Sequence, residues 1–232
     1  MKAYFETENG ILYHADCQHI LPEISEIDMV LTDPPYGIDY QCTFKEKTRR
    51  LPKIANDKDS DLSFLKNVME RLFYSANENV HAYIFCRWDK WPIPVNPWKL
   101  KNMLVWDKIS HGTGDLQSSY APQHELIAYA VKGKRGFNGK RNSDIVHQTR
   151  ISCISNRTLH HSCQKPVGLM MYFIEKSSNK GDMVIDPFLG SGTTAIACEL
   201  TQRKWNGIEI SEQYCEIAAM RIEKEIKQLK LF

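Results

Sequence analysis

A short segment combines an acid, two prolines and an aromatic ring: Asp33-Pro34-Pro35-Tyr36-Gly37. The apolar run 29–32 before it reads as a strand, so the segment lies at the strand's carboxyl end. Two prolines fix two φ angles and lack backbone N–H groups, which leaves the carbonyls before and between them free to accept hydrogen bonds. The Asp33 carboxylate adds an acceptor, and Tyr36 offers a flat ring for stacking. These residue types also occur in ordinary turns, but together they predict a site for an aromatic amine.

A second segment predicts a nucleotide-like ligand. It reads as a strand, a turn and the start of a helix: Val184-Ile185-Asp186-Pro187-Phe188-Leu189-Gly190-Ser191-Gly192-Thr193-Thr194-Ala195. Within it, Gly190, Gly192 and Ala195 have the G-x-G-x-x-A spacing that lets backbone approach a nucleotide and lets a helix pack closely on a strand. Residues 205–210 read as the next strand. Glu209 therefore lies about 20 residues beyond the turn, where a carboxylate can accept both hydroxyls of a ribose.

The two segments, in this order, resemble the β-class of S-adenosylmethionine-dependent DNA amino-methyltransferases, in which the catalytic motif precedes the cofactor motif. The resemblance covers most of the chain and implies S-adenosylmethionine as cofactor, double-stranded DNA as partner and a role in restriction-modification. Four further segments match the family pattern: Asp16 after Leu12-Tyr13-His14-Ala15, then Val105-Trp106-Asp107-Lys108, then His124-Glu125, and finally His161-Ser162-Cys163-Gln164-Lys165-Pro166.

The resemblance implies a role for each motif residue. The catalytic residues are Asp33, Pro34, Pro35 and Tyr36. The residues implied to bind the methionine and nearby ribose region of the cofactor are Asp186, Phe188, Gly190, Ser191, Gly192 and Thr193. Glu209 is implied to bind the ribose hydroxyls. Asp16 is implied near the adenine ring of the cofactor and Lys165 near its carboxylate. From the residues alone, Phe188 could instead belong to the core, Asp16 could cap a helix and Lys165 could lie on the surface.

The chemistry of amine methylation explains the catalytic motif. The exocyclic amino group of adenine or cytosine is a poor nucleophile because its lone pair is delocalised into the ring. The Asp33 carboxylate and the Pro34 carbonyl can each accept one amino hydrogen, which favours a tetrahedral nitrogen in the transition state. The ring of Tyr36 would stack on the base. Because the methyl donor cannot reach the amine in line within a duplex, the target nucleotide must be flipped out.

Several other functions compete with this interpretation. Adenine N6 is favoured because the first catalytic residue is Asp33, whereas cytosine-N4 enzymes resemble the pattern more often with Ser there. Carbon-5 methylation of cytosine is excluded because it needs a Pro-Cys nucleophile, which this chain lacks. An NAD-binding oxidoreductase that uses Gly190, Gly192 and Glu209 would leave residues 33–36 unexplained. A non-catalytic DNA-binding subunit is disfavoured because both motifs are intact.

Residue periodicity predicts the elements that position these motifs. The alternation of strands and helices indicates an α/β fold with helices on both faces and ligands at the carboxyl ends of the strands. The resemblance implies a Rossmann-like methyltransferase sheet, mostly parallel, with an antiparallel edge hairpin and a circularly permuted motif order. Residues 1–232 are expected to form a single domain. Strands are predicted at residues 11–16, 27–32, 80–86, 103–108 and 125–131, and helices at 62–73, 166–176 and 212–228.

Length and composition agree with one globular domain. The chain has 232 residues, of which 42% are apolar and 25% charged. No apolar stretch approaches the roughly 18 residues of a membrane helix, so we expect a cytoplasmic protein. Seven scattered cysteines without a Cys-x-x-Cys pair indicate reduced thiols. Cys153, His160, His161 and Cys163 could be drawn as a zinc site, but their spacing matches no common zinc finger, and no metal is expected.

The charge pattern predicts where DNA binds. The net charge is only +2, so binding would need a local patch. Residues 131–160 hold seven basic residues against one acid and contain Phe137 for stacking, and a second basic run spans residues 45–53. Segments 38–60, about 109–123 and 132–160 are therefore expected to be DNA-contacting inserts, with 131–160 as the main surface. A homodimer is also expected, because enzymes of this resemblance often pair.

Overall fold

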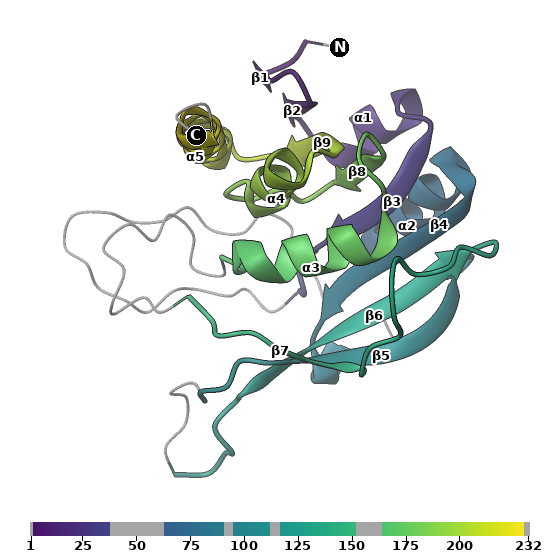
Figure 1. The fold of residues 1–232 in the computed structure, drawn as a ribbon, viewed down its shortest axis with the longest axis vertical. Helices are drawn as coiled ribbons and strands as arrows, with labels where there is room; N and C mark the ends of the chain where they lie inside the picture. Colours follow the sequence, from purple (N-terminus) through teal and green to yellow (C-terminus); the bar gives the residue numbers. More distant parts are fainter. Residues whose placement is uncertain (1, 38–62, 91–94, 112–116, 152–163, 230–232) are drawn as a thin grey trace.

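The structure is a computed structural model that describes residues 2–37, 63–90, 95–111, 117–151 and 164–229. One sheet of nine described strands runs through it in the order β1-β2-β9-β8-β3-β4-β6-β5-β7 (Figure 1). The strands are β1 (Phe5–Glu6), β2 (Gly10–His14), β3 (Ile27–Thr32), β4 (Ala76–Cys86), β5 (Lys99–Asp107), β6 (His124–Lys132), β7 (Ile145–His147), β8 (Met183–Asp186) and β9 (Lys204–Glu209).

The sheet is mostly parallel, as predicted. Strands β2, β9, β8, β3 and β4 are parallel neighbours. Strand β6 runs antiparallel to both β4 and β5, so β5 and β6 form the predicted hairpin. The hairpin does not form the edge of the sheet, however, because β7 pairs in parallel with β5 outside it. Residues 145–147 were predicted to belong to an insert; they belong to the sheet instead.

Helices cover both faces of the sheet, which confirms the predicted layers (Figure 1). Helices α3 (Val167–Ser177), α4 (Thr193–Thr201) and α5 (Glu212–Leu229) bury apolar side chains with one face. The other face is covered by α1 (Cys17–Ile20), the short 3-10 segment Leu21–Glu23 and α2 (Ser63–Ser75). None of the helices described here is long and apolar enough to cross a membrane.

Local sequence explains these helices. In α2 the buried residues Leu65, Val68, Met69 and Leu72 recur with helical spacing, so one stripe faces the sheet. Helix α3 begins one residue after Pro166, which stands at its N-cap because proline lacks the N–H that a helix interior needs. The predicted cap of α5 is present, with the Tyr214 amide donating to Ser211 Oγ at 3.5 Å.

The strand directions define two edges of the sheet. The carboxyl edge is the one at which β3, β4, β8 and β9 end, after Thr32, Cys86, Asp186 and Glu209. Because β6 runs the opposite way, it begins at this edge: Leu126 pairs with Cys86, and His124 pairs with Asp107 at the end of β5. Side chains from these six strands therefore meet at the carboxyl edge, which is where ligands bind in open α/β sheets.

Candidate active site

Asp33 lies directly beyond the end of β3, at the carboxyl edge, as predicted. Its side chain is 22% exposed, and the following Pro34 is buried. The hydroxyl of Tyr36 donates a hydrogen bond to Asp33 Oδ1. The motif predicts a role only for the ring of Tyr36, as a stacking surface; in the structure its hydroxyl also contacts the acid of the motif.

Lys165 lies at the catalytic motif. Its ammonium donates to Asp33 Oδ2, lies 3.2 Å from Glu125 Oε2 and sits 5.0 Å from the centre of the Phe85 ring. Lys108 Nζ contacts the other oxygen of Glu125, Oε1, at 2.7 Å. The resemblance implied that Lys165 lies near the cofactor carboxylate; here it bridges two carboxylates of the protein. Lys108 and Glu125 were matched to the family pattern but given no role.

We call these four residues the charge row: Lys108, Glu125, Lys165 and Asp33. Burial raises the pKa of Asp33, the Lys165 ammonium opposes this rise and the Glu125 carboxylate adds to it. Burial also raises the pKa of Glu125, but the two ammonium groups beside it outweigh that effect and hold its pKa below the usual value. Burial and the neighbouring Asp33 raise the pKa of Tyr36 well above its usual value, so Tyr36 stays a neutral donor.

Asp186 ends β8 and is almost fully buried, with 3% of its surface exposed. Its Oδ1 accepts hydrogen bonds from the Thr32 hydroxyl at 2.8 Å and the Phe188 amide at 3.1 Å. Its Oδ2 accepts from the Thr194 hydroxyl at 2.6 Å. Burial raises its pKa to about 6, although the three hydrogen bonds oppose this rise. Asp186 therefore ties β3, β8 and α4 together at the point where both motifs begin.

The glycine-bearing turn has the backbone that its sequence predicts. Gly190 and Gly192 have φ angles of 54° and 84°, in the left-handed region that favours glycine. A Cβ on Gly192 would also lie 3.0 Å from the Cβ of Ala218 in α5. Glycine at this position therefore permits both the turn and the close packing of α5 on it.

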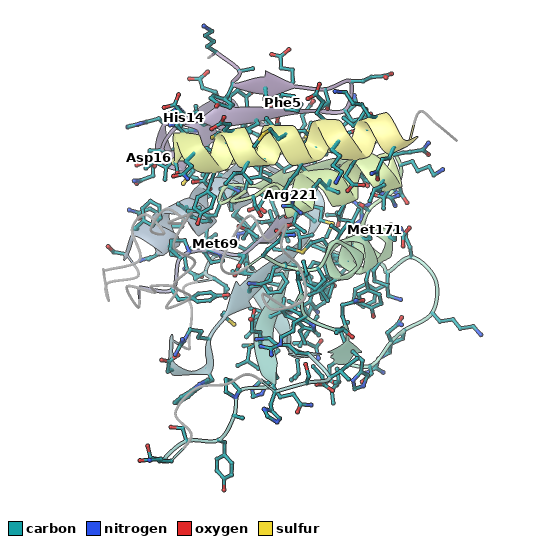
Figure 2. The ribbon with its side chains drawn as sticks, turned by 90° about the vertical axis from the view of Figure 1, so that its left-hand side faces the viewer. Phe5, His14, Asp16, Met69, Met171 and Arg221 are labelled. Carbon is teal, nitrogen blue, oxygen red and sulfur yellow. The ribbon has the colours of Figure 1, made fainter. Side chains whose placement is uncertain are left out.

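Arg221 was missed by sequence reasoning. It extends from α5 on the side facing the body of the protein (Figure 2) and donates to the carbonyl and hydroxyl of Ser191, the latter at 2.9 Å. Thr193 Oγ1 lies 3.4 Å from the same nitrogen. Burial lowers the pKa of Arg221 to about 10. No motif marks this residue, because only the packing of α5 on the turn brings it there.

Glu209 ends β9 and meets the turn, as its spacing predicted. Its Oε2 accepts from the Gly190 amide and its Oε1 from the Ser211 amide, both at 2.8 Å. Burial raises its pKa, while these backbone amides oppose the rise. Each carboxylate oxygen has two lone pairs, so both can still accept a hydroxyl. A carboxylate held beside a glycine turn at the carboxyl edge fits the ribose of a nucleoside-type cofactor.

Two further predicted cofactor residues also have structural roles. Asp16 caps α1 by accepting from the Gln18 amide at 2.9 Å, and the Ala15 amide donates to the Glu209 carbonyl at 3.1 Å, which brings Asp16 close to Glu209. Phe188 packs edge-on against Phe64, with ring centres 5.9 Å apart. Both residues lie at the carboxyl edge, and both take part in packing or capping.

Some predicted positions lie outside the described residues: the basic run 45–53 and the four residues Cys153, His160, His161 and Cys163. His124 is described and exposed at the start of β6. In the part of the chain that the structure describes, no group of three or more His, Cys, Asp or Glu residues could hold a metal ion.

The first part of the predicted DNA surface lies at the opposite edge of the sheet from Asp33. Strand β6 ends there, where Lys132 pairs with Val80, six residues before β4 reaches the carboxyl edge. Arg135 forms an ion pair of 2.5 Å with Asp182, the residue just before β8. Phe137 packs against the rings of His81 and Tyr129, with centres 5.2 and 5.4 Å away. These contacts anchor the segment, with Phe137 in it, to the body of the protein.

The chain then returns to the carboxyl edge through β7. His147 Nδ1 contacts Asp107 Oδ2 at 2.9 Å, and the Arg150 guanidinium donates to the His111 carbonyl at 3.3 Å. The last described residues of segment 132–160 therefore lie beside the end of the β5–β6 hairpin, on the same side of the sheet as Asp33.

Comparison with known proteins agrees with this geometry. Residues 27–220 match the DNA methylase family of N6 and N4 amino-methyltransferases. The chain is 26% identical to the type II methyltransferase M2.MboI of Moraxella bovis, over 99% of this chain and 94% of that protein. The crystal structure of the M1.HpyAVI–SAM complex superposes with a TM-score of 0.71 at 25% identity, covering 91% of this chain and 98% of that one.

The PvuII DNA methyltransferase, a cytosine-N4-specific enzyme, shares the fold with a TM-score of 0.72 at 15% identity, over 97% of this chain and 93% of that one. The Asp-Pro-Pro-Tyr motif at the end of β3 and the glycine turn at the end of β8 thus stand on a known methyltransferase scaffold. This chain belongs to the N6/N4 DNA methylase family, whose members are DNA amino-methyltransferases.

Proposed function

We propose that this chain methylates the N6 amine of adenine in double-stranded DNA, with S-adenosylmethionine as the methyl donor. The observation that carries the proposal is the position of Asp33: an acid, followed by a prolyl carbonyl, at the carboxyl edge beside the glycine turn. Asp at the first position of the motif favours adenine over cytosine, by resemblance within the family. The family match also removes the reason to consider the alternative function, an oxidoreductase that binds NAD.

The protein's own groups perform two tasks at the amine. The Asp33 carboxylate and the Pro34 carbonyl each accept one amino hydrogen, which localises the nitrogen lone pair as the new bond forms. The nitrogen must then lose one proton. Asp33 is suited to accept it, because burial raises the pKa of this carboxyl. The Tyr36 ring stacks on the flipped base while its hydroxyl keeps Asp33 oriented.

The cofactor is held by residues from two strand ends. When bound, S-adenosylmethionine supplies an activated methyl group, so the protein needs neither a metal nor a covalent intermediate. Glu209 accepts the ribose hydroxyls. The turn 190–193 offers backbone groups to the methionine and ribose region, and Asp186 and Arg221 fix the shape of that turn. Asp16 lies on the adenine side.

DNA binds at the carboxyl edge, because a flipped base must reach Asp33. Large side chains are exposed there in segments that follow β4 and join β5 to β6: Trp88 is 73% and Ile109 57% exposed, and Tyr120 is fully exposed. Arg150 lies next to that hairpin. We therefore propose that DNA contacts the described residues 109–111, 117–123 and 145–151, and not Lys134 or Arg135 at the opposite edge.

Analysis of methylated nucleosides tests the proposal. DNA from cells that express the protein is digested to nucleosides, and N6-methyladenine and N4-methylcytosine are quantified by mass spectrometry. We expect N6-methyladenine, and none above background with Asp33→Ala. N4-methylcytosine would keep the family and correct the target base. Absence of both products, together with binding of NAD in preference to S-adenosylhomocysteine, would overturn the proposal.

The predicted homodimer and the cytoplasmic location belong to the same proposal. Sedimentation of the purified protein, with and without a DNA duplex, measures the first. A monomer on DNA would show that the homodimer prediction is wrong and would leave the proposed reaction unaffected.

A further inference from the structure

The charge row links the β5–β6 hairpin to the catalytic aspartate. Its charges alternate from Lys108 through Glu125 and Lys165 to Asp33. We propose that Glu125 is a positioning residue. Together with Lys108 it holds the Lys165 ammonium between two carboxylates, so that Lys165 orients Asp33 but binds its carboxylate more weakly than it would without Glu125. This inference rests on the proposed amine methylation, in which Asp33 accepts an amino hydrogen.

The geometry makes Lys165 a shared partner. Only 6% of its side chain is exposed, so its charge must be balanced by nearby acids and not by water. It donates to Asp33 Oδ2, and Glu125 Oε2 is 3.2 Å away. An ammonium between two carboxylates interacts with each more weakly than it would with one alone, because each acid draws it away from the other.

Glu125 is fixed from the hairpin side. Its backbone pairs with Trp106 across the β5–β6 ladder, and the Lys108 amide donates to the Gln123 carbonyl at 2.9 Å, so Lys108 and Glu125 are diagonal neighbours across the hairpin. Their side chains meet at 2.7 Å. The Lys108 ammonium also lies 5.3 Å from the centre of the Trp106 ring. Lys108 therefore holds Glu125 in place and limits how strongly Glu125 attracts Lys165.

The balance matters because Asp33 must accept a hydrogen from a neutral amine. A carboxylate bound tightly by one ammonium is a weak acceptor, and a protonated carboxyl has lost its charge. Among the described residues, six titratable groups set this balance around Asp33: Lys165 before α3, Glu125 on β6, Lys108 after β5, Tyr36 in the motif itself, Cys86 at the end of β4 and Asp186 at the end of β8.

Substitutions of Glu125 and of Lys108 should shift the pKa of Asp33 in opposite directions. In Glu125→Gln, the negative charge that raises the pKa of Asp33 is lost and Lys165 turns fully to Asp33, so the pKa of Asp33 falls. In Lys108→Met, Glu125 draws Lys165 away from Asp33, so the pKa of Asp33 rises. A purely structural role for these residues would lower the rate without such opposite shifts.

The experiment measures the single-turnover rate of methyl transfer against pH, with saturating cofactor and DNA. In Glu125→Gln we expect the acid limb of the profile to move to lower pH and the plateau rate to fall several-fold; in Lys108→Met we expect the limb to move to higher pH. Asp182→Asn is the matched control, because it breaks the Arg135–Asp182 ion pair at the opposite edge of the sheet. The acid limb of the Asp182→Asn rate profile should lie at the same pH as that of the wild type.

A second readout needs neither cofactor nor DNA. The carbon-13 signal of the Asp33 carboxyl, assigned with Asp33→Asn, is titrated in the free protein and should show the same two opposite shifts. If the wild type transfers no methyl group, the proposed function fails. If it does, but both titrations of Glu125→Gln match the wild type, this inference fails. Should Glu125→Gln not fold by circular dichroism, Lys108→Met decides alone, and an unshifted or downward limb overturns the inference.

Discussion

Replacing Asp186 by Asn should remove a pH-dependent loss of stability. Burial raises the pKa of Asp186 from 3.8 to about 6, which corresponds to about 3 kcal/mol between the folded and unfolded states. Because the folded state binds this proton more tightly, the stabilisation by protonation is fully present below the unfolded value of 3.8 and is lost as the pH rises through about 6. Above that pH, the wild type holds a buried carboxylate at a cost of about 3 kcal/mol.

The asparagine should be accommodated. Its oxygen can keep the hydrogen bonds from Thr32 and Phe188, and its amide nitrogen can donate to the Thr194 hydroxyl, which can accept as well as donate. The fold of the variant should therefore survive, and the difference from wild type should reflect mainly the ionisation of one carboxyl group.

Urea unfolding measures this difference at about pH 5 and about pH 7.5, where other titrating groups cancel between the two proteins. We expect the free energy of unfolding of the wild type, relative to Asp186→Asn, to fall by about 1.4 kcal/mol between those pH values. Asp144→Asn, at an exposed acid, controls for the loss of one carboxyl and should show no such change. A constant difference for Asp186→Asn would refute the assignment of a raised pKa to this carboxyl.

Substitutions at three further residues test the site. Asp33→Ala should abolish methyl transfer while S-adenosylhomocysteine still binds, as calorimetry would show; equal loss of both would make Asp33 structural. Tyr36→Phe should keep much of the turnover at high pH and lose it at low pH. The reason is that the Tyr36 hydroxyl lowers the pKa of Asp33, so its removal moves the acid limb of the rate profile to higher pH. Tyr36→Ala should lose turnover at every pH. A Phe variant as inactive as Ala throughout would contradict the stacking role. Glu209→Gln should weaken binding of S-adenosylhomocysteine by on the order of 1.5–3 kcal/mol per lost charge-assisted bond. Glu212→Gln, three residues further on and exposed, should leave the binding unchanged. An unaltered dissociation constant for Glu209→Gln would move the ribose contact elsewhere.

The features that could be predicted from sequence are those written in consecutive residues. Strand β3 has the predicted bounds, and the turn around Gly190 and Gly192 has the left-handed backbone that its glycines indicate. Glu209 meets that turn because a fixed number of residues separates the two ends of one strand–helix–strand unit. In each case the local pattern and the local structure depend on the same few residues.

The features that could not be predicted depend on contacts between distant parts of the chain. Lys165 was given a cofactor role, but its partners Asp33 and Glu125 reach it only when β3 and β6 lie in one sheet. Strand β7 is three residues long, and its strand conformation comes from pairing with β5 rather than from a periodic pattern. The edge of the sheet that the basic segment after β6 occupies could not be predicted either, because charge alone does not show it.

The reversed direction of β6 has a consequence for how such an enzyme could change its target sequence. Because β5 ends and β6 begins at the carboxyl edge, Lys108 and Glu125 are both placed by the backbone pairing of the hairpin stem, before the connecting residues contribute anything. Connections between paired strands tolerate changes in length and composition far better than the strands do. If the connection between Lys108 and Glu125 reads DNA, as proposed above, it could be exchanged for one that reads another sequence while the groups around Asp33 keep their positions. Recognition and chemistry could then evolve separately within one hairpin.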